Sequence, residues 1–130
     1  MITKIKKIVL LICLLLNTSI VFAKWELIGQ NDNGLYYVDM DSVEIDAVNI
    51  FMWILQDKYS KNELGHQSVI ILWQVQCNLR KMKTLSFRGY SDRGGQGKLL
   101  DSFDETVDFD YIEPGSPVGA LAYVGCGYEN

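Results

Sequence analysis

Cysteines are the residues of this 130-residue chain most able to link distant parts of the fold covalently. There are three, Cys13, Cys77 and Cys126, and Cys13 lies in an apolar N-terminal run that we expect to be removed. In an oxidising compartment, the two that remain are expected to form a disulfide. Two buried free thiols, or half of a zinc site, are the alternatives. Zinc is disfavoured because only His66 could join the cysteines as a conventional soft ligand.

Residues 1–23 have the three parts of a secretory signal peptide. A basic start with three lysines precedes an uncharged apolar run over residues 8–16, and residues 21–23 read Val-Phe-Ala, a suitable cleavage site. Nine apolar residues are too few to span a bilayer as a helix, although a membrane anchor is the rival interpretation. We therefore expect residues 24–130 to form one exported domain without a transmembrane segment.

The expected mature chain is acidic and carries no lipid site. Cys13 follows Ile12 inside the apolar run, whereas a lipoprotein cysteine normally follows a small residue. Cleavage leaves nine Lys and Arg against 16 Asp and Glu, a net charge of −7. This charge argues against nucleic acid as a partner. We expect a protein of the periplasm, the medium or the cell surface, and not a lipoprotein.

One segment departs from this acidic background. Six of the nine cations fall in a span whose single acid is Asp92, and we call them the basic stripe: Arg80, Lys81, Lys83, Arg88, Arg93 and Lys98. Such a stripe can steer an anionic partner, such as a glycosaminoglycan, a membrane surface or an acidic protein patch. Alternatively, the stripe pairs with the acidic stretch 101–113, if the two segments are neighbouring strands.

Nothing in the sequence predicts an enzyme. His66 is the only histidine and is expected at the surface of a polar loop, and both mature cysteines are assigned to the disulfide, so a nucleophile with its base is lacking. The glycine-rich loop 91–97 does not have the spacing of a phosphate-binding loop. The acids near residues 39–41 and 101–110 do not have the spacing of a calcium loop. We expect no catalytic residue, no metal and no cofactor.

Short apolar runs separated by turn residues predict an antiparallel sheet. Strands are expected over residues 35–39, 43–45, 48–55, 68–79 and 84–90, with strand or irregular structure over 99–111. The odd positions from 69 to 79 are apolar, so Cys77 should point into an apolar layer. Ile70 and Leu72 make the other face apolar too, and such sheets are usually covered on both faces. One cover should be a helix, and the other a curled sheet, a partner or a second copy.

The C-terminal segment predicts a short helix. Ser116 can cap it and Pro117 can take its first position. Apolar or small residues then recur at helical spacing at Val118, Leu121, Ala122, Gly125 and Cys126. The predicted fold is α+β: a single curled antiparallel sheet of about six strands with a short C-terminal helix packed on it and tied to it by the disulfide.

An ordered set of residues runs across almost all of the mature chain: Tyr37-Val38-Asp39, Ser42-Val43, Val48, Trp53, Leu55, Asp57, Ser68, Cys77, Arg80, Leu85-Ser86, Tyr90, Pro114-Gly115-Ser116 and Cys126. This set resembles the bacterial surface-adhesin protein E family. The resemblance implies a small antiparallel sheet with a disulfide-tied C-terminal helix, and Trp53 and Tyr37 as core residues. It also implies a Gram-negative source.

The same resemblance implies a function. The family's name comes from adhesion to host cells and from capture of matrix and serum proteins such as vitronectin, laminin and plasminogen. We therefore expect an exported, non-enzymatic binding module whose ligand is such a protein or an anionic polymer, with a homodimer left open. Because the chain lacks the lipid site of anchored adhesins, the alternative is a periplasmic envelope protein, for instance an inhibitor or assembly factor.

Overall fold

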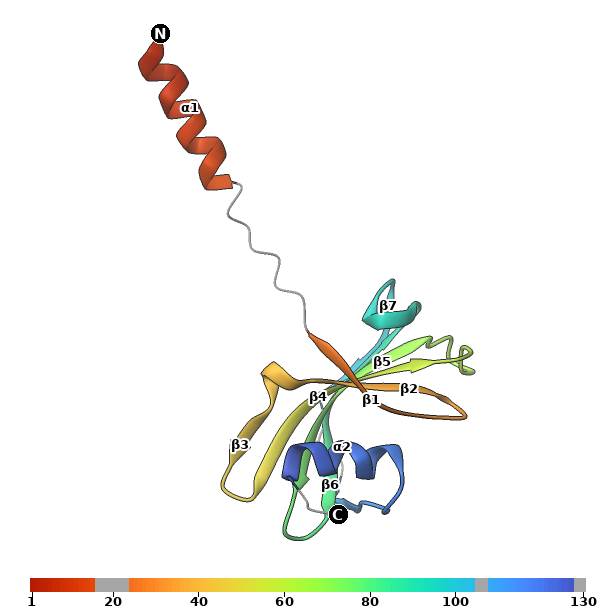
Figure 1. The fold of residues 1–130 in the computed structure, drawn as a ribbon. Coiled ribbons are helices and arrows are strands. Elements are labelled where there is room, and N and C mark those ends of the chain that lie inside the picture. The colour runs from red at the N-terminus through yellow and green to blue at the C-terminus, as the bar shows by residue number, and fades with distance from the viewer. Residues whose placement is uncertain (16–23, 105–107, 128–130) are drawn as a thin grey trace.

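The structure is a computed structural model that describes residues 1–15, 24–104 and 108–127. It begins with the helix α1 (Ile2–Leu15), drawn apart from the folded domain in Figure 1. Fourteen helical residues span about 21 Å, less than the roughly 30 Å hydrocarbon core of a bilayer. Among the described residues, no helix is long and apolar enough to cross a membrane. The expected cleavage site at residues 21–23 lies outside the described residues.

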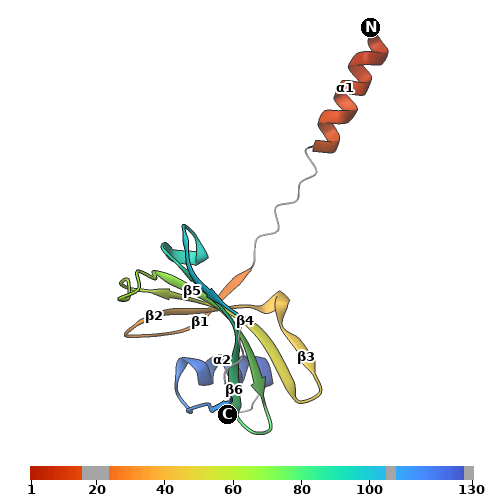
Figure 2. The same ribbon diagram turned by 180° about the vertical axis from the view of Figure 1, so that it is seen from behind.

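In the described part of the chain, eight strands form one antiparallel sheet that twists strongly but does not close (Figures 1 and 2). They are β1 (Trp25–Asn31), β2 (Gly34–Asp39), β3 (Glu44–Asp46), β4 (Asn49–Lys58), β5 (Ser68–Gln76), β6 (Lys81–Tyr90), β7 (Leu99–Phe103) and β8 (Asp110–Tyr111). The strand order is β1-β2-β4-β5-β6-β7, while β3 pairs with β4 and β8 with β6. The short 3-10 helices η1 (Met40–Ser42) and η2 (Arg93–Gly95) lie in the connections.

The expected count of about six strands is therefore too low. β4 and β6 are each ten residues long, and each pairs with two successive partners along one edge. β2 and β3 share one edge of β4, and β7 and β8 share one edge of β6. With three and two residues, β3 and β8 are too short to show an alternating pattern of their own. The type of fold, an antiparallel sheet with one C-terminal helix, is confirmed.

The helix α2 (Pro117–Cys126) covers one face of the sheet, as Figures 1 and 2 show from opposite sides. Ser116 Oγ accepts a hydrogen bond of 3.0 Å from the Gly119 backbone N–H, and Pro117 occupies the first turn, as the sequence predicts. The buried core cluster lies between helix and sheet and contains Val38, Ile50, Met52, Ile54, Trp73, Val75 and Ala122. A Cβ atom on Gly125 would lie 2.7 Å from Met52 Sδ, so glycine is what allows the helix to approach this closely.

The tryptophan of this core is Trp73, and the prediction that Trp53 and Tyr37 belong to the core is wrong. Both side chains are only partly buried and point to the opposite face. Along a strand, successive side chains alternate between the faces. Because Met52 and Val38 point to α2, their neighbours Trp53 and Tyr37 cannot.

We call the face of the sheet opposite α2 the open face. At one end of it, Gly95 of η2 lies against the side chains of Leu55 and Ile70. Farther along, Phe51, Trp53 and Leu72 remain partly exposed, and we call these three residues the apolar strip. In the register, Trp53 lies directly opposite Leu72, and Phe51 is two residues before Trp53 on β4. Of the two expected covers, the helix is present, and η2 covers only part of the other face.

Cys77 and Cys126 form a disulfide, with an S–S distance of 2.03 Å and a Cα–Cα distance of 5.6 Å. The bond joins the last residue of α2 to the residue that follows β5. The predicted pairing is confirmed, and neither sulfur remains as a free thiol or a zinc ligand.

Removal of this bond should lower the free energy of unfolding by about 4 kcal/mol, because a loop of roughly 50 residues would no longer be closed in the unfolded chain. Urea unfolding of the Cys77→Ala/Cys126→Ala variant measures the loss. A reductant should destabilise the wild type to a similar degree and leave the double variant unchanged. A wild type that is indifferent to reductant would contradict this expectation.

Candidate functional site

A β-bulge in β6 decides which face the cations of this strand occupy. Along the ladder with β5, pairing steps from Ser86 to Thr84 and leaves Leu85 without a partner. In a regular strand, Lys83 and Arg88 are five positions apart and would point to opposite faces. The extra residue of the bulge changes this alternation, so both side chains point to the same face.

Three cations of the basic stripe therefore line the open face. Lys81, Lys83 and Arg88 lie opposite Gln76, Gln74 and Ile70, which are alternate residues of β5. We call these three cations the cation row. The apolar strip lies on the same face, because Leu72 falls between Gln74 and Ile70 in the same alternation and pairs with Trp53. The open face thus carries a row of positive charge beside exposed aromatic and aliphatic surface.

Arg88 forms the only carboxylate ion pair that the described residues of the row make. Its Nη1 donates hydrogen bonds of 2.8 Å to Asp104 Oδ1 and 2.8 Å to Ser86 Oγ. Hydrogen bonds from Arg88, and then from Ser86, hold the pKa of the Asp104 carboxyl below its ordinary value. The pair is exposed, with side-chain exposures of 31% for Arg88 and 69% for Asp104, so its effect on stability is small.

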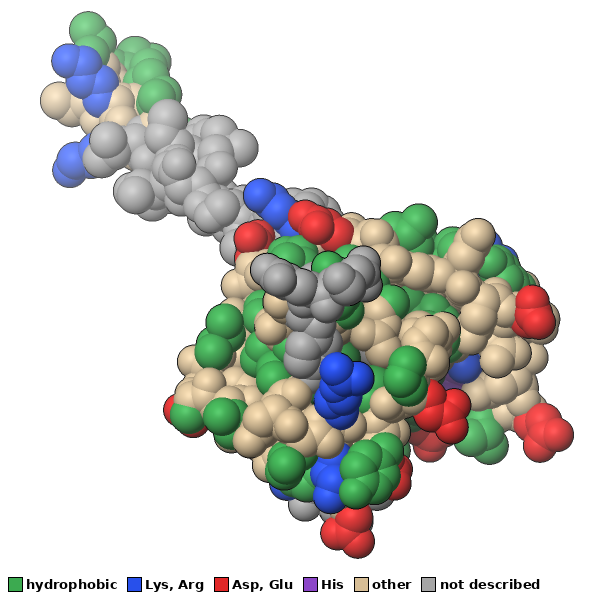
Figure 3. All heavy atoms as spheres, turned by 60° about the horizontal axis from the view of Figure 1, so that its bottom comes forward, with side chains coloured by type: hydrophobic (Ala, Val, Ile, Leu, Met, Phe, Trp, Pro, Cys, Tyr) green, Lys and Arg blue, Asp and Glu red, His purple; other side chains and the backbone are tan. Residues whose placement is uncertain are grey.

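The two lysines of the row meet aromatic rings instead. Lys83 Nζ lies 4.6 Å from the centre of the Phe109 ring, and Lys81 Nζ lies 4.8 Å from that of Tyr111. Both distances fall within the range of cation–π attraction. Figure 3 looks onto the end of the domain that carries α2 and shows Lys and Arg atoms directly beside hydrophobic side chains.

These contacts decide how the stripe relates to the acidic stretch that follows it. The two segments do lie side by side, because β7 and β8 both pair with β6. Charge pairing between them is limited in the described residues to the Arg88–Asp104 ion pair. Lys81 and Lys83 lie over aromatic rings, so among the described residues Asp104 is the carboxylate that pairs with the row.

The other three stripe cations lie outside the row. Arg80 is in the turn between β5 and β6 with φ of 49°, and its carbonyl accepts a hydrogen bond from the Ile112 backbone N–H. Arg93 lies on η2 and donates to the Tyr59 carbonyl at 3.4 Å. Lys98 is exposed in the loop before β7. The six cations of the basic stripe therefore do not form one surface. Three lie in a row on β6, and the other three lie in the connections between strands.

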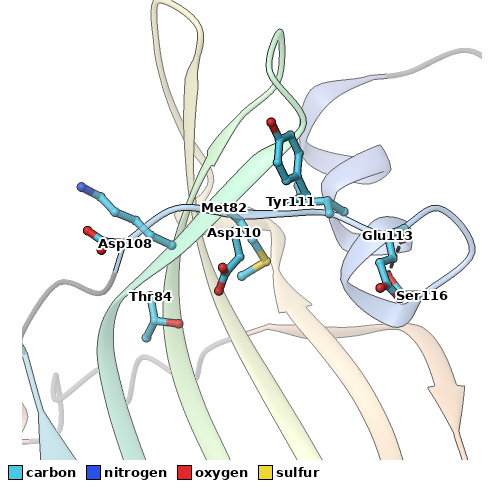
Figure 4. Close-up of a pocket in the computed structure, with 9 residues that line it drawn as sticks. Met82, Thr84, Asp108, Asp110, Tyr111, Glu113 and Ser116 are labelled. Carbon is cyan, nitrogen blue, oxygen red and sulfur yellow. Dashed lines mark hydrogen bonds between the residues drawn. The ribbon is translucent and has the colours of Figure 1, made fainter.

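A pocket of about 300 Å³ opens between β6 and the chain from residue 108 to 116 (Figure 4). Met82 and Ile112, which pack against the core, form apolar parts of its lining, and Asp108, Asp110 and Glu113 add carboxylates. This volume is at the lower end for small-molecule sites. Among the described residues, no group of three ligating side chains is placed to hold a metal ion. This pocket could not be predicted from the sequence, because one of its walls is the two-residue strand β8.

The prediction that His66 lies at the surface is wrong. Only 2% of the residue is exposed, and it lies against Gly89, where an added Cβ would be 2.6 Å from Nε2. Nε2 is 2.8 Å from Asp101 Oδ2, and Phe87 packs beside the ring at 5.9 Å between centroids. A glycine opposite Asp101 on β6 and β7 leaves the space that the ring fills. The local sequence around His66 cannot predict this space, because residues of two other strands form it.

The hydrogen bonds of His66 indicate its tautomer and its role. Asn62 Oδ1 already accepts from the backbone N–H groups of Leu64 and His66, so Asn62 Nδ2 faces His66 Nδ1, which must accept. Nε2 then carries the proton and donates to Asp101. With both ring nitrogens engaged, no lone pair remains to activate a nucleophile. The ring therefore fastens the loop before β5 to β6 and β7.

Sequence and structure comparisons now identify the family. The family model described as surface-adhesin protein E matches residues 25–127, nearly the whole described domain. The chain belongs to the surface-adhesin protein E family. The family is one of surface adhesins, so membership indicates a binding protein, and the expected resemblance is confirmed. None of the curated proteins compared with this family member matches it in sequence.

Solved structures support the fold of this adhesin E family member. Crystal form II of Haemophilus influenzae protein E is 17% identical, with a TM-score of 0.62, and the match covers 82% of this chain and 90% of that one. Protein E from non-typeable Haemophilus influenzae is also 17% identical, with a TM-score of 0.56 and coverage of 84% and 79%. At this level of identity the likeness concerns the fold.

Replacing Gly89 by alanine should destabilise the adhesin domain by about 1–3 kcal/mol, because the new methyl group would overlap the His66 ring. Urea unfolding of Gly89→Ala, His66→Ala and the double variant tests the contact: the alanine should cost less when His66 is already absent. Gly29→Ala, where nothing lies within 4 Å of the new methyl group, is the control. Equal losses at positions 29 and 89 would contradict the packing.

Asp104 should titrate below the ordinary aspartate value of about 3.9 when followed by carboxyl NMR shifts, and Arg88→Gln should raise its pKa towards that value. Because the folded-state pKa is the lower one, the stabilisation from this pair is present above the unfolded pKa and is lost as pH falls through the folded pKa. Lys98→Gln should leave the titration unchanged. An unaltered Asp104 curve in Arg88→Gln would argue against the pair.

Proposed function

We propose that this protein is an exported, non-enzymatic binding module that holds its ligand against the open face, with the cation row as the anion-binding part. Membership of an adhesin family carries the proposal, since it indicates binding as the function. The arrangement of the open face supports it, because the bulge places three cations beside the apolar strip. The expected ligands are host matrix or serum proteins, or an anionic polymer.

Export of the chain is part of the proposal. The family match begins at residue 25, two positions after the expected cleavage site, so the matched domain and the expected signal peptide do not overlap. An oxidising compartment also suits the Cys77–Cys126 disulfide. A Gram-negative source, expected from the resemblance, fits both points.

A periplasmic role is the second candidate function. It is favoured by one observation: Cys13 follows Ile12, which is not the small residue that a lipid-attachment site normally has there. In this case the same open face would bind a component of the envelope, for instance as an inhibitor or assembly factor. Fractionation of cells that express the full precursor separates the two functions, because a protein found only in the periplasm counts against adhesion.

Reversing the charge of the cation row should weaken retention on immobilised vitronectin, laminin, plasminogen or heparin. The variant is Lys81→Glu/Lys83→Glu/Arg88→Glu, and the loss should be greatest at low ionic strength, where exposed charges are least screened. Lys61→Glu/Arg93→Glu/Lys98→Glu makes the same change in net charge outside the row and serves as the control. If the row variant is retained like the wild type on every surface, the row does not bind the ligand.

A further inference from the structure

The cation row already shows which groups it accepts. Along β6, its three members contact one carboxylate and two aromatic rings of the same chain: Arg88 with Asp104, Lys83 with Phe109 and Lys81 with Tyr111. Each of these groups is a protein side chain. A sulfated polysaccharide offers anions to such a row but no aromatic rings.

The row also has capacity for a second set of contacts. Arg88 keeps 31% of its side chain exposed, and the two lysines are partly exposed as well. An ammonium group has three donors, and an aromatic ring on one side leaves the others accessible. A ligand can therefore bind the row while the internal contacts persist.

The apolar strip adds a requirement that only some ligands meet. Trp53 and Leu72 lie opposite each other across β4 and β5, with Phe51 next on the same face, and all three remain partly exposed beside the row. Apolar and aromatic surface of this kind stabilises a complex only when the partner covers it with apolar groups. A fully polar chain would leave the strip without a matching surface.

From these contacts we infer that the partner is a protein segment rich in both acidic and aromatic residues, which lies along the open face. The inference rests on the proposed function and narrows its ligand to one class. Charge complementarity supports it: the expected mature chain has a net charge of −7, and the row is a local exception where an acidic segment is attracted. From Lys81 to Arg88 the strand is roughly 20 Å long, which matches about seven extended residues.

Synthetic seven-residue peptides test this directly. The probe alternates acidic residues with tyrosine and phenylalanine, its first control replaces each aromatic residue by alanine at the same charge, and a heparin oligosaccharide of similar length is the second. Calorimetric titration uses the exported, disulfide-bonded chain recovered after processing. The acidic-aromatic peptide should bind, and the alanine control should bind about tenfold more weakly.

Variants then locate the binding. Lys81→Glu/Lys83→Glu/Arg88→Glu should weaken the acidic-aromatic peptide by more than about tenfold, whereas Lys61→Glu/Arg93→Glu/Lys98→Glu should keep its affinity within about threefold. The neutral variant Lys81→Gln/Lys83→Gln/Arg88→Gln, with native far-ultraviolet circular dichroism, should also lose affinity, which separates loss of the row from misfolding. Trp53→Ala should weaken the aromatic peptide more than its alanine control.

Three outcomes would overturn the inference: no binding of the acidic-aromatic peptide, equal binding of both peptides, or equal losses in the row variant and the control variant. Row-dependent binding of heparin with none of the peptide would remove the acidic-aromatic partner and leave the proposed function intact. Row-independent retention on every matrix surface, together with row-dependent peptide binding, would instead show that the row does not hold the matrix ligand, and would leave the acidic-aromatic partner in place.

Discussion

The packing of α2 against the sheet is the contact on which the rest of the domain depends. The helix contains Gly119 and Gly125, which favour helix formation poorly, so its own sequence does not hold it in place. Two features do so instead. Gly125 lets the helix sit directly on Met52, and the disulfide fixes its last residue to the sheet. Gly125 thus weakens the isolated helix, but it also lets the helix pack closely on the sheet and cover the core.

Because α2 covers one face of the sheet, the side chains of the other face remain accessible where η2 does not cover them. The β4 side chains of the core cluster, Ile50, Met52 and Ile54, point towards α2 at even positions, so the odd positions, including Phe51 and Trp53, lie on the open face. There η2 covers one end only. The open face and the core therefore take alternate side chains of the same strand.

The features that depend on local patterns were predictable from the sequence, and those that depend on contacts between distant segments were not. Local spacing predicts the cap at Ser116 and the strands β4 and β5. The cysteine pair followed instead from removal of the segment that holds Cys13. His66 was misplaced because its burial depends on Gly89 and Asp101, which lie on two other strands. The bulge did leave a trace: polar residues occupy odd positions at Lys81 and Lys83 but even positions from Ser86 onward, and this switch of alternation is what a bulge produces.

The unpaired Leu85 also limits how β6 can vary in length. If one residue were lost at this point, either half of the strand would have to turn over relative to the other. Turning the first half would place the ammonium groups of Lys81 and Lys83 beneath α2, in an apolar layer where unpaired charges are very unfavourable. Turning the second half would carry Arg88 to the same side and expose Phe87. The strand therefore tolerates exchange of side chains far better than insertion or deletion, and its length, more than any one residue, keeps the two faces of the domain distinct.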